Sequence, residues 1–223
     1  TVAIYIGISN MIGLFGLKSP TKDVGVTGAL ALMSIVLIEY AGVHQKGGKG
    51  FLKSLNDGNV ATEGKNAVIL GAGGAARAIA VELAEAGMRN IMVINRNRDH
   101  AQLLVDIINK KTPAAGNFMP WDGCVQIPED TDILVNATSI GFLDDAKPDI
   151  QYEKLPKDLV VCDVIPNKLR TSFLQEAERH NLRTFNGLEM LVNQGALAYE
   201  LWTGRKAPVE VMKQAMKKEY GEC

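Results

Sequence analysis

Residues 71–76 read Gly-Ala-Gly-Gly-Ala-Ala and fit the spacing G-x-G-x-x-A. In such a loop the first glycine permits a tight turn from a strand into a helix, and the second lets the backbone approach a pyrophosphate. The small Ala76 lets the helix lie close to the strand, and the free N–H groups at the helix start face the phosphates. We therefore expect this segment to bind a dinucleotide. The expected contacts are Gly71, Ala72, Gly73, Gly74 and Ala75.

The sequence on both sides of this loop has the pattern that the motif requires. The apolar run at 67–70 predicts a strand that is covered on both faces. A helical pattern follows from about 75 to 86 and ends at Gly87, a residue typical of helix C-termini. A second apolar run occupies 91–94. This order of strand, loop, helix and strand supports dinucleotide binding, and a glycine-rich turn without a ligand is the alternative.

The residues after the second predicted strand indicate which dinucleotide is bound. An acidic residue here would accept hydrogen bonds from the ribose 2′-hydroxyl of NAD. The chain instead has Asn95, followed by Arg96 and Arg98. Arginine binds phosphate in a bidentate manner and stays charged, which favours the 2′-phosphate of NADP. Two alternatives stay open: the arginines are only solvated, or Asp99 binds the ribose of NAD.

The remaining chain continues the alternation of short apolar strands and helical patterns. Further strands are expected at 118–119, 132–135, 159–162 and 182–185, and helices at about 98–109, 171–181, 188–202 and 208–218. Such alternation is typical of a parallel sheet with helical crossovers. Six strands predict an α/β fold with a doubly wound parallel Rossmann sheet, a smaller N-terminal α/β segment and C-terminal helices.

Composition narrows the class of protein. The 223 residues are 47% hydrophobic and carry a net charge of −1, so nothing favours a nucleic-acid partner. The uncharged runs 1–17 and 24–38 are each shorter than the ~20 residues that span a bilayer. The three cysteines are widely spaced, which predicts a reducing compartment and no metal site. We expect a cytoplasmic protein without a membrane partner, either a monomer or a homodimer.

Several further motifs, in a fixed order, accompany the glycine loop. They are Gly50-Phe51-Leu52, Asn95-Arg96, Asn136-Ala137-Thr138-Ser139-Ile140-Gly141, Asp163-Val164, Gly187-Leu188-Glu189-Met190-Leu191-Val192-Asn193-Gln194-Gly195-Ala196 and Trp202-Thr203-Gly204. From about Gly48 to Lys218, the chain resembles the shikimate dehydrogenase family, including its quinate/shikimate relatives. The resemblance implies an NADP-dependent oxidoreductase that interconverts 3-dehydroshikimate and shikimate in aromatic amino acid (chorismate) biosynthesis.

The resemblance also implies roles for residues outside the glycine loop. Residues at the carboxyl end of the fourth strand would lie beside the nicotinamide ribose, a place that agrees with the general rule for ligands of open α/β sheets. Gly187 would let its backbone approach the nicotinamide, and the amide of Gln194 would bind the substrate through its donor and its acceptor. The remaining expected cofactor contacts are Asn136, Ala137, Thr138, Ser139, Val164 and Met190.

The chain departs from the family where the catalytic residues are expected. The family's N-terminal domain is about twice as long as the segment before Gly64 and carries a catalytic Lys and a partner Asp. If Val26-Thr27 corresponds to the family's Lys motif, the Lys position is Ala31; the alternative is that Gly28-Ala29 corresponds to the next motif of the family. The Asp position corresponds to Gly47. Lys18, Lys22, Lys46 and Lys49 lie near in sequence, but none has the family's neighbours. The catalytic residues therefore stay unassigned.

These departures shape the expected domains and the competing functions. We expect a remnant or divergent substrate domain at 1–52, an NADP-binding domain at 53–190 and C-terminal helices at 191–223 that pack back toward the N-terminal domain.

A further departure follows Asp163, where Pro166 and Lys168 replace the family's Tyr and Pro. The alternatives to a shikimate dehydrogenase are a non-catalytic or truncated NADP-binding module and a quinate/shikimate dehydrogenase that uses NAD.

NADP should bind more tightly than NAD, by roughly ten- to a hundredfold, because charge-assisted hydrogen bonds to a phosphate contribute ~1.5–3 kcal/mol. Calorimetric titration of both cofactors measures the ratio. In the Arg96→Ala variant the affinity for NADP should fall and that for NAD should stay. Equal affinities in the wild-type protein would contradict the prediction.

Overall fold

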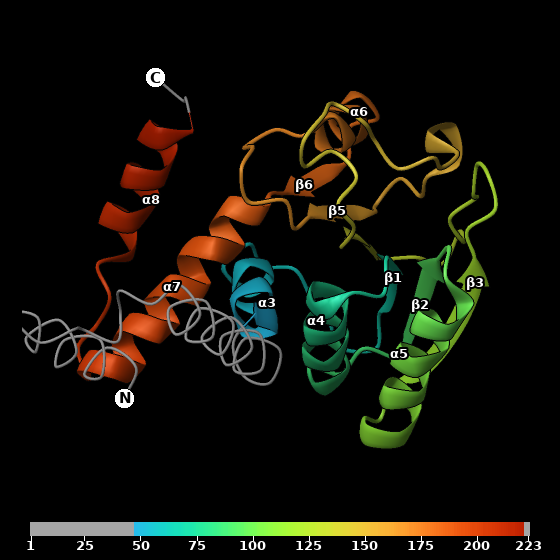
Figure 1. The fold of residues 1–223 in the computed structure, drawn as a ribbon, viewed down its shortest axis with the longest axis horizontal. Helices are drawn as coiled ribbons and strands as arrows, with labels where there is room; N and C mark the ends of the chain where they lie inside the picture. The colour runs from blue at the N-terminus through green and yellow to red at the C-terminus, as the bar shows by residue number, and fades with distance from the viewer. Residues whose placement is uncertain (1–46, 221–223) are drawn as a thin grey trace, which may run out of the picture. The chain divides into compact units, whose positions relative to one another are not determined.

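The computed structural model describes residues 47–220. The chain separates into two compact units, Thr1–His44 and Gln45–Cys223, and all described residues belong to the second. Residues 1–46 of the expected N-terminal α/β segment, its uncharged runs and Cys223 lie outside the described residues, as do Lys18, Lys22, Ala31 and Lys46. The described chain is a parallel sheet with helices on both faces (Figure 1).

The sheet has six strands in the order β3-β2-β1-β4-β5-β6, and every neighbouring pair is parallel. The strands are β1 (Asn66–Leu70), β2 (Asn90–Asn95), β3 (Ala115–Pro120), β4 (Ile133–Asn136), β5 (Val160–Asp163) and β6 (Arg183–Phe185). This is the strand order of a doubly wound dinucleotide-binding fold. The predicted fold class is therefore confirmed.

Most strands could be predicted from the sequence because their residues are buried. All five residues of β1 are buried, because β1 lies between β2 and β4 and is covered on both faces. The edge strand β3 is different, since its residues are exposed or half-buried. It is longer than the predicted 118–119, and its final Pro120 is tolerated because an edge strand has few ladder partners.

Helices cover the two faces of the sheet. The helices before the C-terminal one are α3 (Gly47–Asp57), α4 (Gly74–Glu85), α5 (Arg98–Lys111), α6 (Ser172–Arg179) and α7 (Gly187–Thr203), with a short 3-10 helix, η2 (Tyr152–Lys154). Helix α8 (Val209–Glu219) follows α7. Apolar residues of α3, α4 and α5 form one core layer with β1, β2 and β4. Apolar residues of α6 and of the segment 121–159 form the second layer, on the opposite face.

Side chains and one glycine fix the ends of the helices after the fourth strand. Thr171 begins α6 by accepting the N–H of Leu174 at 3.3 Å. Asn186 begins α7 by accepting the N–H groups of Leu188 and Glu189, each at 3.1 Å. Polar N-caps of this kind satisfy donors that the helix leaves free. Gly204, with φ +67°, ends α7 in the left-handed conformation.

Helix α3 was not predicted, because its glycines have low helix propensity. These glycines are required by packing. A Cβ atom at Gly48 would lie 2.3 Å from the carbonyl oxygen of Ala78 in α4, and a Cβ atom at Gly50 would lie 2.9 Å from that of Met190 in α7. The absent side chains let α3 lie directly against both helices. The predicted boundary at 52/53 falls within α3, and the one at 190/191 falls within α7.

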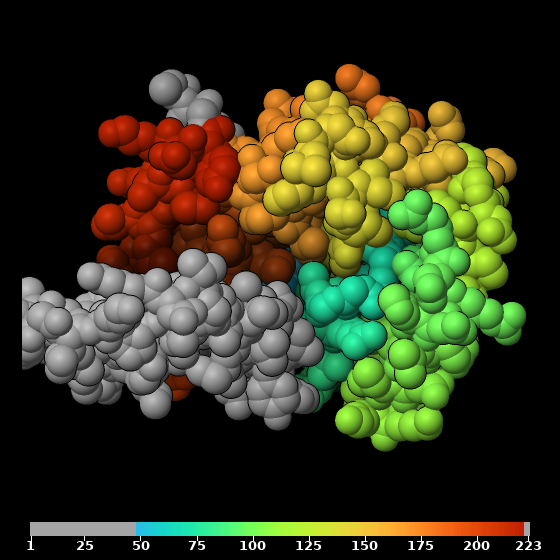
Figure 2. Space-filling view, in the orientation of Figure 1, coloured from blue at the N-terminus to red at the C-terminus, as the bar shows by residue number. Residues whose placement is uncertain are grey.

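The C-terminal helix α8 is attached differently. None of its residues is buried, and it contacts α7. Figure 2 shows α8 as the red surface beside α7. In the described part of the chain, no helix is long and apolar enough to cross a membrane.

A polar contact joins two strands at the amino edge of the sheet. Asp132, just before β4, accepts the N–H of Asn66 at 2.8 Å and the amino group of Lys65 at 2.9 Å. Burial raises the pKa of the Asp132 carboxyl, but the hydrogen bonds from Lys65 and Asn66 outweigh this effect, so the pKa is lower than usual. The ionised carboxylate therefore favours the folded state.

Asp132→Asn should reduce the loss of stability in acid. The folded-state pKa of Asp132 lies below its unfolded value of about 3.9, so its contribution is present above that value and is lost as pH falls through the folded pKa. Calorimetry between about pH 5 and about pH 2 should show a shallower fall of the melting temperature in the variant. Asp122→Asn makes the same charge change at an exposed position and is the control. Identical slopes in wild type and Asp132→Asn would contradict this expectation.

Candidate functional site

The glycine loop lies at the carboxyl end of β1. Gly71 has φ +102°, which only glycine adopts readily, and its N–H donates to the carbonyl of Ile94 at 2.8 Å. Gly73 is the N-cap of α4 and gives the helix no side-chain cap. Gly73, Gly74 and Ala75 are exposed, and the first turn of α4 carries no acidic residue. The start of α4 therefore presents free N–H groups to an anion.

The two glycines of this loop have different physical roles. A Cβ atom at Gly71 would lie 2.8 Å from the carbonyl oxygen of Ala137, so the backbone after β4 occupies that space. A Cβ atom at Gly73 would have no atom within 4 Å. Gly71 is thus required by the fold, whereas the open space beside Gly73 is accessible to a ligand. Figure 2 shows the yellow surface of the segment after β4 next to the blue-green surface of α4.

The contact between Gly71 and Ala137 lies at the switch point of the sheet. Strands before β4 in the chain extend the sheet to one side of β1, and β4 begins the extension to the other side. Ala137 continues the pairing with β1, because its N–H donates to the carbonyl of Leu70 at 2.9 Å. Ligands of open α/β sheets bind outside the carboxyl ends of the strands at this point.

The residues after β2 are arranged as an open turn. The side chain of Asn95 donates to the carbonyl of Asn97 at 2.7 Å, and Asn97 caps α5 by accepting the N–H of His100 at 3.0 Å. Arg96 and Arg98 are exposed, and among the described residues neither forms an ion pair. Both guanidinium groups are therefore available to a phosphate. Asp99 is exposed in the first turn of α5.

The four predicted residues after β4 differ in what they expose. Asn136 is fully buried, and its side-chain oxygen Oδ1 accepts the hydroxyl of Thr138 at 2.7 Å and the N–H of Thr138 at 3.2 Å. The Thr138 hydroxyl in turn accepts the N–H of Ile140 at 3.1 Å. Asn136 and Thr138 therefore shape the turn, and the exposed Ser139 is the one whose side chain faces solvent.

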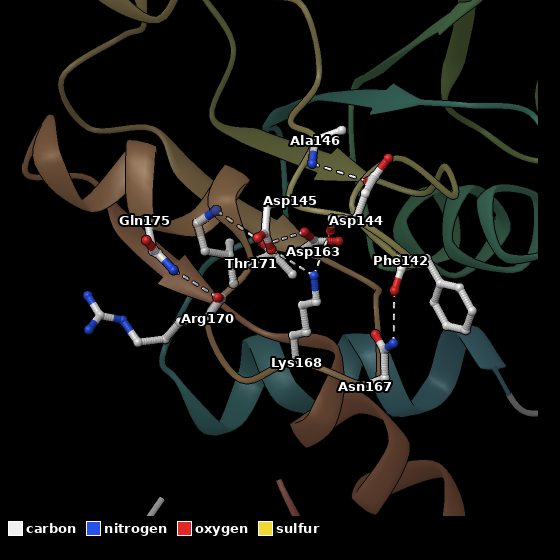
Figure 3. A network of polar contacts seen from close by, with 11 residues as sticks. Phe142, Asp144, Asp145, Ala146, Asp163, Asn167, Lys168, Arg170, Thr171 and Gln175 are labelled. Carbon is white, nitrogen blue, oxygen red and sulfur yellow. Dashed lines mark hydrogen bonds and ion pairs between the residues drawn. The ribbon is translucent and has the colours of Figure 1, made fainter. Parts of the chain in front are cut away.

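A buried carboxylate, Asp163, connects the end of β4 with the loop after β5, and Figure 3 shows it beside Thr171. It accepts the amide of Asn136 at 3.1 Å, the N–H of Ile165 at 3.2 Å and the hydroxyl of Thr171 at 2.6 Å. Burial raises the pKa of the Asp163 carboxyl, and hydrogen bonds from Thr171, Ile165 and Asn136 oppose the rise. Asp163 belongs to a sequence motif, but its bond to Thr171 depends on the fold and has no signal in the sequence.

A second set of contacts joins the same two loops nearer the surface. The amino group of Lys168 donates to the carbonyl of Asp144 at 2.5 Å and pairs with Asp145 at 3.0 Å. The side chain of Asn167 donates to the carbonyl of Phe142 at 2.9 Å (Figure 3). The resemblance predicts proline at position 168. Proline has no side-chain amino group, so it could not make the bonds that Lys168 makes with Asp144 and Asp145.

The predicted residues of α7 lie close to β5 and α3. Gly187 is buried, and a Cβ atom there would lie 2.5 Å from the carbonyl oxygen of Ile165. Val164 is half-buried beside it. Gln194 and Met190 are also half-buried, and the backbone and Cβ of Gln194 face Gly50 of α3. The role of Gln194 toward a substrate stays a prediction.

Two further features do not belong to the predicted cofactor contacts. Lys49 is the only proposed lysine in the described part of the chain, and it is exposed on α3. A cavity of about 430 Å³ lies between the start of α7 and α8, and residues such as Glu189 and Lys213 line it. None of the predicted cofactor contacts lines this cavity. No group of three or more metal-ligating side chains occurs within residues 47–220.

Comparison with known proteins places the chain in a family. Residues 54–142 match the family described as Shikimate / quinate 5-dehydrogenase, and residues 187–217 match the Shikimate 5'-dehydrogenase C-terminal domain. A shikimate dehydrogenase (NADP(+)) of Methanocaldococcus jannaschii is 39% identical over 198 residues, which are 87% of this chain and 69% of that protein. The chain belongs to the shikimate dehydrogenase family. The resemblance seen in the sequence is thus confirmed.

Two further relatives show how much of the family's length is present. A shikimate dehydrogenase (NADP(+)) of Desulforamulus reducens is 40% identical over 78% of this chain and 62% of its own length. The crystal structure of the ligand-free 5-ketofructose reductase of Gluconobacter sp. strain CHM43 superposes with a TM-score of 0.76. It is 47% identical and covers 78% of this chain and 63% of the reductase. The chain therefore spans about three fifths of the length of each of these two proteins.

Gly71→Ala should destabilise the protein much more than Gly64→Ala. Both glycines have positive φ, but a Cβ atom at Gly64 would have no neighbour within 4 Å. Left-handed strain alone costs roughly 1–2 kcal/mol, and the contact with Ala137 adds to it at Gly71. Thermal unfolding followed by circular dichroism measures both. Gly73→Ala should leave the melting temperature within ~2 °C of wild type. A Gly71→Ala protein as stable as Gly64→Ala would show that the Gly71–Ala137 contact is not required.

Proposed function

We propose that this chain is an NADP-dependent oxidoreductase that interconverts 3-dehydroshikimate and shikimate. The observation that carries the proposal is the glycine loop at the switch point of a sheet whose sequence is about 40% identical to shikimate dehydrogenases (NADP(+)). NADPH supplies a hydride when bound. The described residues would hold its phosphates, orient its nicotinamide and supply one substrate contact, Gln194.

The fit to a dinucleotide rests on space and charge. The open side of Gly73 admits a pyrophosphate against the backbone, and the uncapped start of α4 offers N–H donors to it. The exposed guanidinium groups of Arg96 and Arg98 fit a 2′-phosphate, and Asn95 occupies the place of the acidic residue that would favour NAD. These features support NADP over NAD.

Residues that follow β4 and β5, and residues of α7, would bind the nicotinamide end of the cofactor. Ser139 after β4, Val164 after β5 and Met190 on α7 would border the nicotinamide ribose and ring, and Gln194 would hydrogen-bond the substrate. The proton that leaves or joins the substrate hydroxyl needs an acid–base group, and such a group typically contributes ~10²–10⁴-fold to the rate. Lys49 is the one described lysine among the candidates, and it is exposed.

A second substrate is favoured by one observation, the 47% identity to a 5-ketofructose reductase over 78% of this chain. Both candidate reactions reduce a ketone on a polyhydroxylated carbon skeleton. They differ in charge, because 3-dehydroshikimate carries a carboxylate and 5-ketofructose is neutral. Free Cys124 and Cys162 support a reducing compartment, which agrees with a cytoplasmic location.

Turnover of shikimate should be very slow, although NADP binds. The expected Lys and Asp positions carry Ala31 and Gly47, and loss of an acid–base group costs ~10²–10⁴-fold. A steady-state assay of NADPH oxidation with 3-dehydroshikimate and with 5-ketofructose, and of NADP reduction with shikimate and quinate, measures it. A kcat near the enzyme median of ~10 s⁻¹ would show that other residues supply the acid–base pair.

The same assay separates the competing functions. Faster turnover of 5-ketofructose than of 3-dehydroshikimate would assign the second substrate. Faster turnover of quinate with NAD would overturn the preference for NADP. Tight NADP binding without turnover of any of these substrates would support the non-catalytic module. Gly73→Ala is the matched control for specific binding, because it should fold normally and bind NADP more weakly.

A further inference from the structure

We propose that Asp163 is the positioning residue that aligns the cofactor contacts of three separate loops. The inference rests on the proposed binding of NADP. Asp163 does not lie among the predicted cofactor contacts, and its carboxylate is turned into the protein, with 2% of its surface exposed. Its effect on a ligand would therefore pass through the groups to which it is bonded.

One set of bonds leads from Asp163 to the glycine loop. Asp163 accepts a hydrogen bond from the side-chain amide of Asn136, and the side-chain oxygen Oδ1 of Asn136 accepts both the N–H and the hydroxyl of Thr138. The backbone of Ala137, between them, lies against Gly71, where even one added carbon would approach to 2.8 Å. Asp163 thus fixes the turn against which the pyrophosphate loop rests.

A second set of bonds leads from Asp163 to α7. The same carboxylate oxygen that holds Asn136 also accepts the N–H of Ile165 at 3.2 Å. The backbone of Val164 and Ile165 packs directly on Gly187, where a Cβ atom would lie 2.5 Å from both. Gly187 begins the helix that carries Met190 and Gln194. The position of α7 therefore depends on the conformation that Asp163 gives to residues 164–165.

The third bond holds the carboxylate itself. The hydroxyl of Thr171 donates to the other oxygen of Asp163 at 2.6 Å, while it accepts the N–H of Leu174 and so caps α6. Among the described residues Asp163 has no cationic partner, so neutral donors alone offset the burial of its charge. A buried carboxylate held in this way costs free energy unless its hydrogen bonds are complete. Removal of one donor should therefore alter its orientation.

Asp163→Asn and Thr171→Val test the proposal. Asp163→Asn replaces one acceptor oxygen of the network with a donor, and Thr171→Val removes both the bond to Asp163 and the cap of α6. Each should weaken NADP binding by roughly tenfold, measured by calorimetry well below the melting temperature. Each should also speed hydrogen exchange at the amides of Thr138 and Ile165, although the Thr171 side chain is hydrogen-bonded to neither. Thr171→Ser keeps the hydroxyl and should behave as wild type.

Asp132→Asn is the matched control. It also removes a carboxylate that joins two strands, but it does so at the amino edge of the sheet, where Asp132 bonds Asn66 and Lys65. It should lower the melting temperature and leave the Kd for NADP within about twofold. The contrast between the two edges distinguishes positioning of the site from general stabilisation of the sheet.

The possible outcomes are distinct. If Asp163→Asn and Thr171→Val lower the melting temperature but leave the Kd for NADP unchanged, the network only stabilises the fold and the proposal is overturned. If Asp163→Asn does not fold, Thr171→Val alone decides. If the wild-type protein does not bind NADP, the proposed function fails. Hydrogen exchange then decides the positioning role, because faster exchange at Thr138 in Thr171→Val supports it and unchanged exchange overturns it.

Discussion

The close approach of the backbone at Gly71 to the backbone at Ala137 is the contact around which the carboxyl edge of the sheet is arranged. It requires a residue without a Cβ atom and with positive φ, and both conditions are met at Gly71. The same principle recurs at Gly187 against Val164 and at Gly48 and Gly50 in α3. Loops and helices that carry predicted ligand contacts are thus held together by backbone contact. Such contact leaves little room for relative movement.

The sheet could be predicted from the sequence because its central strands are buried on both faces. Residues 67–70 and 91–94 are uninterrupted apolar runs, and each is followed by residues with helical periodicity. The edge strand β3 gave a weaker signal, since half of it faces solvent and it ends at Pro120. Helix α3 gave none, because tertiary packing against α4 and α7 requires the glycines that helix propensity disfavours.

The candidate site could be predicted only where a local pattern carries the chemistry. The glycine loop and the arginines after β2 are contiguous in the sequence, and their roles follow from the adjoining strands. The link from Thr171 to Asn136 through Asp163 joins residues that are far apart in the chain, so no local pattern reveals it. A threonine just before a helix predicts a cap, and the cap is present, but the second bond of its hydroxyl depends on the fold.

Because Arg96 and Arg98 are exposed, a preference for NADP over NAD that depends on them would change with salt concentration. Both guanidinium groups stand in water, where dissolved ions screen a charge over about 8–10 Å at physiological ionic strength. Contacts of a pyrophosphate with the start of α4 would be made through backbone N–H groups between the buried Ala72 and Ala76, and these contacts would be screened less. Added salt would therefore weaken the selection between NADP and NAD before it weakened the binding of either cofactor. Selectivity and affinity would respond to different parts of the same site.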